Sequence, residues 1–312
     1  TATDRDAGQK GRLSETPQPR NGILGGAACL VLSGAAALFY ELVWTQQFSI
    51  VFGSSEIATA SVLGVYLAGL GFGAALALRR CRSSRRPLLT YAALECAIAL
   101  SALAVPWGLR HAQELLYRAL ATDGLPSAAL GTSWLWQLLI AVLLLAVPTL
   151  CLGASFPYAI RGLVLSDAGA PRRTAWLYSA NTFGAVSGGL AAGILVLPAV
   201  GIRTTTWIGA ALSLAAAALA VLVWRRRSVG APTATAPGEL AVDRSFPFVP
   251  VVIVAGAVSL GSQILWTRLL IHFVGSGLYA LSVLLATYLL GLTLGSMIAG
   301  VVGTSRRRDA AG

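Results

Sequence analysis

Residues 33–55 read SGAAALFYELVWTQQFSIVFGSS, and this stretch indicates most clearly which fold class the chain belongs to. It is an apolar run with one carboxylate, and it is long enough to cross a hydrocarbon core of about 30 Å. A related stretch, AGAVSLGSQILWTRLLIHFVGSG, returns at residues 255–277. The sequence therefore predicts a transmembrane helix that occurs twice.

The composition of the whole chain agrees with this prediction. Of 312 residues, 56% are hydrophobic and 11% are charged, whereas soluble proteins have roughly 45–50% and about 25%. A soluble domain is excluded, and an all-α polytopic membrane protein with eight transmembrane helices is predicted. The eight apolar blocks lie at 23–46, 56–78, 88–109, 133–155, 175–199, 203–224, 247–270 and 278–303.

Positive charge alternates between the loops. The chain has 23 basic and 12 acidic residues, and the arginines cluster after the second, fourth, sixth and eighth blocks. Basic loops stay on the cytoplasmic side of a membrane, so both termini are predicted to be cytoplasmic. Arginines that fix the orientation and contact anionic lipid headgroups also explain the positive net charge, so nucleic acid is not the expected partner. The expected partner is the lipid bilayer.

The repeat indicates how the chain is organised. Residues 33–80 align with 255–302 without a gap, and the alignment pairs Gly34 with Gly256, Trp44 with Trp266, Gly53 with Gly275 and Gly73 with Gly295. Six predicted spans separate the copies, which makes the repeat parallel, as in the two halves of major-facilitator-type transporters. We expect a tail at 1–22, a six-span unit at 23–224, a cytoplasmic linker at 225–246, the first two spans of a second unit at 247–304 and a tail at 305–312. This division predicts that the chain is part of a longer protein.

Two carboxylates fall inside apolar blocks, Glu41 and Glu95. A charge at the bilayer centre costs roughly 2.5–3.5 kcal/mol on insertion scales, so such residues usually face the protein interior. Each is a candidate for binding a solute, and each can instead be a protonated or hydrogen-bonded structural residue, an interpretation that fits Glu95 better than Glu41. Glu41 stands out because its counterpart in the second copy is the neutral Gln263.

The remaining candidates are polar or aromatic. Asn181 suits a helix contact network as readily as a binding site, and Trp44 and Trp266 are typical of interfacial anchors. Arg268 follows the second Trp-Thr pair, where the first copy has Gln46. Small residues four apart predict close helix packing and possible oligomer contacts. The segment 110–132 predicts a short helix lying in the outer interface. No catalytic, metal-binding or cofactor-binding motif is present in the sequence.

Several segments together resemble a known family. They are 33–55 followed by LGVYLAGLGFGAALA at 63–77, LECAIALSAL at 94–103, PTLCLGASFPYAIRGLV at 148–164 and WLYSANTFGAVSGGLAAGILVLPAVGIRTT at 176–205. In this order they resemble the membrane region of bacterial spermidine synthase-like proteins, often called fused transporter/spermidine synthase proteins. The resemblance implies a cytosolic aminopropyltransferase-like domain or subunit as a partner. The residues of that domain are not in this sequence, so no catalytic residue carries over.

Two functions from different classes follow. The first is a membrane unit of a spermidine synthase-like protein that binds or transports a small, cationic, polyamine-like solute. The second is a structural membrane anchor, or a subunit of a larger membrane complex, with no solute path. Aminopropyltransferase activity would require an attached Rossmann-type domain.

Overall fold

The computed structural model describes residues 20–53, 56–123, 133–164, 170–228 and 248–309. Within these ranges every regular element is a helix. The elements are α1 (Arg20–Phe52), α2 (Glu56–Arg80), η1 (Cys81–Ser83), α3 (Pro87–Asp123), α5 (Ser133–Leu163), α6 (Ala170–Leu190), η2 (Ala191–Val196), α7 (Leu197–Ser228), α8 (Phe248–Val274) and α9 (Gly277–Asp309). Most of the predicted tail at 1–22 and of the linker at 225–246 lies outside the described residues.

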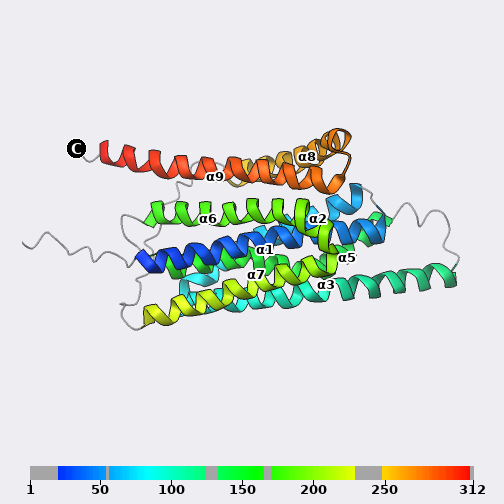
Figure 1. Ribbon diagram of the computed structural model, residues 1–312, viewed down its shortest axis with the longest axis horizontal. Helices are drawn as coiled ribbons and strands as arrows, with labels where there is room; N and C mark the ends of the chain where they lie inside the picture. The colour runs from blue at the N-terminus through cyan, green and yellow to red at the C-terminus, as the bar shows by residue number, and fades with distance from the viewer. Residues whose placement is uncertain (1–19, 54–55, 124–132, 165–169, 229–247, 310–312) are drawn as a thin grey trace, which may run out of the picture.

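Seven helical stretches in the described part of the chain are long and apolar enough to cross a membrane. The longest, Ala170–Arg226, has 57 residues, which a straight helix would extend to about 85 Å. It is not straight. Gly201 has φ 74° and ψ 175°, a backbone conformation open mainly to glycine. From this point α7 runs back toward the other end of the bundle, packed against α1 and α3 (Figure 1).

Glycines let the central helices meet backbone to backbone. A Cβ on Gly34 of α1 would collide with the carbonyl oxygen of Asn181 on α6, and a Cβ on Gly184 of α6 would collide with the carbonyl of Val31. The pair α2 and α5 is built the same way, with Gly73 against Leu150. Since lipid removes the hydrophobic force between helices, such close packing supplies much of their attraction.

The buried side chains form a cluster toward each end of the bundle. One contains Tyr40, Trp44, Phe48 and Tyr66 among its members, and the other is built around Leu30, Tyr91 and Leu163. The second cluster lies at the end where α2 passes into α3, α5 ends, α6 begins and α7 ends (Figure 1). Arginines gather there: Arg79, Arg80, Arg82, Arg85, Arg86, Arg161, Arg172, Arg173, Arg225 and Arg226. Arg86 lies over the ring of Trp224, 5.9 Å from its centre.

The segment 110–132, predicted from the sequence to form a short separate helix in the outer interface, differs from that prediction in its described part. Helix α3 continues without a break from Pro87 to Asp123, 37 residues in all, and projects beyond the bundle (Figure 1). The prediction of a separate helix within 110–132 is therefore wrong for the part up to Asp123. The reason is local, because the residues between Pro106 and Asp123 include mostly good helix formers such as Ala, Leu, Glu, Gln and Arg.

The first and last helical hairpins share local geometry at positions 222 residues apart. Both reverse at a glycine with positive φ, 84° at Gly53 and 74° at Gly275. In both, a threonine hydroxyl donates 2.8 Å to the carbonyl four residues earlier, Thr45 to Glu41 and Thr267 to Gln263. In both, a tyrosine hydroxyl joins the two helices: Tyr66 donates to the Ala37 carbonyl at 3.3 Å, and Tyr288 accepts from the Ser259 hydroxyl at 3.2 Å. The two hairpins also turn at the same end of the bundle (Figure 1).

Candidate functional site

A cleft of about 440 Å³ lies between the α1–α2 hairpin and the α8–α9 hairpin, near their turns. Its polar lining comes from both hairpins and consists of Thr45, Gln46, Ser49, Thr59, Thr267, Arg268 and Ser276. Because Thr45 and Gln46 occupy the same places in the first copy as Thr267 and Arg268 in the second, the two Trp-Thr segments contribute equivalent positions to one cleft.

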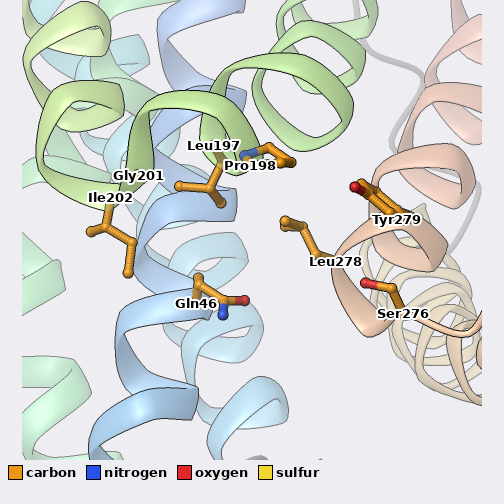
Figure 2. A pocket seen from close by; sticks show the side chains of 8 residues that line it. All are labelled: Gln46, Leu197, Pro198, Gly201, Ile202, Ser276, Leu278 and Tyr279. Atoms are coloured by element: carbon orange, nitrogen blue, oxygen red, sulfur yellow. The ribbon is translucent and has the colours of Figure 1, made fainter.

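A second cavity of about 270 Å³ adjoins the cleft and shares Gln46, Ser276 and Leu278 with it. Figure 2 shows Gln46 on α1 and Ser276 and Leu278 beside the α8–α9 turn, with Pro198 and Gly201 of the α6–α7 reversal on the other side. The six residues before this reversal, Ala191–Val196, form a π-helix. Pro198 explains this local widening, since proline has no N–H to donate and its ring clashes with the carbonyl four residues earlier.

The chemistry of the cleft is that of hydroxyl, amide and guanidinium groups. Hydroxyl and amide oxygens accept hydrogen bonds from an ammonium or amine, and the same groups donate to an anion. Arg268 is exposed and adds positive charge to one wall, where the equivalent position on the other wall is the neutral Gln46. The described lining contains no carboxylate.

Glu41 lies one helical turn before Thr45 on α1 and is 4% exposed. Among the described residues, the Thr45 hydroxyl donates to the backbone carbonyl of Glu41 and not to its carboxyl group. The carboxyl lies in the same helix as the cleft residues Leu42, Thr45 and Gln46, yet it is not among the cleft's lining residues.

Glu95 lies apart from the cleft and is fully buried where α1, α3 and α7 meet. Its Oε1 accepts a hydrogen bond of 2.5 Å from the Ser33 hydroxyl. Its Oε2 is buried and has no hydrogen-bond partner among the described atoms. The Tyr91 and Ser213 hydroxyls are the other polar groups beside this carboxyl. The arrangement is a buried carboxyl surrounded by hydroxyls from three helices.

The other predicted residues occupy different environments. Asn181 is half-buried on α6 and its backbone oxygen meets α1. Gln263 is half-buried, with no partner in the described residues for its Nε2. Trp266 is 54% exposed, as an interfacial anchor requires. Trp44 is fully buried and stacks on Tyr40, with ring centres 5.4 Å apart, so the anchor interpretation of Trp44 is wrong.

The structure thus separates the predicted candidates into groups. Arg268 lines the cleft, Glu41 and Gln263 lie one turn from the two cleft threonines, and Glu95 belongs to another cluster. Sequence reasoning missed most of the cleft residues, including Gln46 as a lining residue, Ser49 and Ser276. The signal for the threonines was available, because Thr45 and Thr267 are a matched pair of the repeat. The hydroxyls around Glu95 carried no signal, since single Ser and Tyr residues are common in transmembrane helices.

Comparison with known proteins finds relatives in mycobacteria. Polyamine aminopropyltransferases of Mycobacterium tuberculosis, strains CDC 1551 / Oshkosh and H37Rv, and of Mycobacterium bovis, strain AF2122/97, are each 31% identical to this chain over 210 residues. The match covers 65% of this chain but 36% of each relative's length. No protein-family model matches the chain, and no solved structure matches it significantly. The chain is therefore helical throughout the regular elements that the structure describes, has membrane-type helices, and is similar to part of these polyamine aminopropyltransferases.

Proposed function

We propose that this chain is the membrane unit of a polyamine aminopropyltransferase-like protein and that it binds a small, cationic, polyamine-like solute. The observation that carries the proposal is the cleft between the two hairpins, where equivalent Trp-Thr segments bring hydroxyl and amide groups together. The mycobacterial relatives suggest the class of solute. Glu41, one turn from the cleft residue Thr45, supplies the negative charge that holds an ammonium group.

The membrane arrangement forms part of the same proposal. The chain crosses a bacterial inner membrane eight times, with α6 and α7 as separate spans on either side of Gly201, and both termini are cytoplasmic. The gathering of arginines at one end of the bundle supports this orientation. The α1–α2 and α8–α9 hairpins are the matching parts of a parallel repeat, which their shared glycine turns and hydrogen bonds support.

The partner in this proposal is a cytosolic aminopropyltransferase-like domain or subunit. The relatives extend well beyond the region that this chain matches, which leaves room for such a domain in them. In this arrangement the six-span unit at 23–224 and the second unit at 247–304 hold the solute close to the catalytic part.

A structural membrane anchor is the second candidate function. The close glycine contacts between α1 and α6 and between α2 and α5 favour it, because rigid packing of this kind suits an anchor as well as a binding unit. In this role the cleft takes no solute, and glycine-rich faces mediate contacts within a larger complex.

Binding of radiolabelled spermidine to the purified protein separates the two candidates. We expect saturable binding that the E41Q variant loses, because the amide keeps the shape of the side chain and removes its charge. Thermal melting of both proteins is the control for folding. Unchanged binding and melting in E41Q, or no saturable binding by the wild type, would favour the anchor.

A further inference from the structure

The carboxyl group of Glu95 is enclosed in the protein without a counter-charge. Its side chain is 0% exposed, and the groups that act on it are the hydroxyls of Ser33, Ser213 and Tyr91. Burying an isolated carboxylate without a partner costs several kcal/mol or more, and in practice such a group takes up a cation or a proton. Neither of the two cavities described above is lined by Glu95, and its side chain is fully enclosed by protein, so the ligand that fits this tight space is a proton.

The two carboxyl oxygens of Glu95 differ in their hydrogen bonding. Oε1 already accepts the Ser33 hydrogen bond at 2.5 Å, whereas Oε2 is buried without a partner among the described atoms. An ionised carboxylate needs donors on both oxygens. A protonated one carries no net charge and becomes a donor at the oxygen that holds the hydrogen, and the hydroxyl oxygens of Ser213 and Tyr91 beside it are acceptors for that O–H. The geometry therefore places the proton on Oε2.

Hydroxyl groups extend from Glu95 in both directions along the bundle. Toward the cleft end, the Tyr40 hydroxyl donates 3.3 Å to Ser213, which adjoins Glu95. Toward the arginine end, the Tyr91 hydroxyl donates 3.3 Å to the Cys29 carbonyl. Hydroxyls both donate and accept, so they can pass a proton by giving up their own hydrogen as they receive another.

We propose that Glu95 is a membrane-embedded proton-binding site that exchanges its proton through the hydroxyls of Ser213 and Tyr40. When the carboxyl releases the proton to the Ser213 oxygen, Ser213 passes its own hydrogen to the Tyr40 oxygen, Tyr40 gives up its hydrogen toward the cleft end in turn, and no redox step is involved. The site is separate from the cleft and does not depend on the identity of the solute bound there.

The titratable groups that surround Glu95 come from several helices. They are Cys29 and Tyr40 on α1, Tyr91 on α3 and Cys151 on α5, while α7 contributes the Ser213 hydroxyl. A free thiol and a phenol ordinarily lose their protons near pH 8.5 and 10, above the range in which a carboxyl titrates. Among the groups around Glu95, a change in protonation below pH 8 therefore reports the carboxyl group.

Infrared difference spectroscopy of the full-length protein in lipid vesicles tests the proposal. We expect a C=O band of a protonated carboxyl that disappears in E95Q, persists in E41Q as the matched control, shifts on transfer to D₂O and diminishes as pH rises. Labelling with ¹³C-glutamate in the E41Q variant shifts the same band, and because Glu95 is then the remaining buried glutamate among the described residues, the assignment stands even if E95Q folds poorly.

Three outcomes would overturn the proposal. A band that never shifts in D₂O would show a sealed, structural carboxyl. A carboxylate band in its place at every pH would show an ionised group. A band that appears or vanishes with Na⁺ at constant pH would assign the site to a sodium ion.

Discussion

Gln46 and Arg268 occupy equivalent places in the two hairpins and line the same cleft, but only one of them is charged. A guanidinium in the cleft repels a cationic solute and attracts an anionic one. At a separation of about 8 Å and an effective dielectric constant near 40, the interaction is on the order of 1 kcal/mol, or about fivefold in affinity.

We therefore predict that R268Q raises the affinity for spermidine about fivefold, because it removes a like charge and copies the state at Gln46. The matched variant Q46R should lower the affinity by a similar factor. Equilibrium binding of labelled spermidine measures both. Changes of the opposite sign would identify the solute as an anion and refute the polyamine assignment.

Hydroxyl contacts at Glu95 lead to a second prediction at this scale. Removing the Ser33 hydroxyl leaves both carboxyl oxygens without a donor, and a buried unsatisfied group costs about 1–3 kcal/mol. S33A should therefore lower the thermal midpoint of the purified protein, while S101A, which removes a hydroxyl bonded only within its own helix, should not. Equal melting of the two variants would contradict the hydrogen-bond assignment at Glu95.

The sequence identified Glu41 and Glu95 because charge inside an apolar block is conspicuous. It did not distinguish their surroundings, since the partners of Glu95 lie 62 and 118 residues away in sequence, at Ser33 and Ser213. It also misjudged Trp44, because tryptophan near a span end is usually interfacial, and here the Tyr40 ring and the α2 residue Tyr66 enclose it.

The equivalent glycines of the two helical hairpins, Gly73 in α2 and Gly295 in α9, have opposite surroundings. A side chain added at Gly73 of α2 would collide with the Leu150 backbone of α5, while its repeat equivalent, Gly295 of α9, has open space around it. The same spacing therefore packs a helix in one copy and leaves a free helix face in the other.

We predict that G73V destabilises the protein by on the order of 2–3 kcal/mol, because the α5 backbone cannot yield as a side chain would. G295V, the matched control, should change stability by less than about 0.5 kcal/mol, as surface substitutions usually do. Thermal melting in detergent compares the two. Similar losses for both would mean that α9 is also tightly packed against a helix at this position.

Apolar block length predicted where most helices lie, because each block must be about 20 residues long to cross lipid. It did not predict that α3 would continue to Asp123, since a helix outside the hydrocarbon region needs only favourable residues and no apolar run. The reversal at Gly201 was marked by its Pro and Gly residues, but the π-helix before it was not, because one extra residue per turn leaves no compositional trace.

For the whole molecule, the topology predicts which end faces the cytoplasm. We expect a cysteine at Ser83, beside the arginine end, to resist an impermeant thiol reagent added to intact cells, in a background without the four native cysteines. A cysteine at the exposed His111, on the projecting part of α3, should react. Labelling of a cysteine at the Ser83 position from outside the cell would show that the predicted orientation is wrong.

The central claim is that the cleft between the two hairpins binds a polyamine-like solute, and photolabelling tests it most directly. A photoreactive spermidine analogue is bound to the purified protein, activated and located by peptide mass spectrometry. The account predicts saturable labelling within residues 42–49, 59–63 and 264–281, which free spermidine prevents. Labelling that free spermidine does not reduce, or that falls outside these three segments, would contradict it.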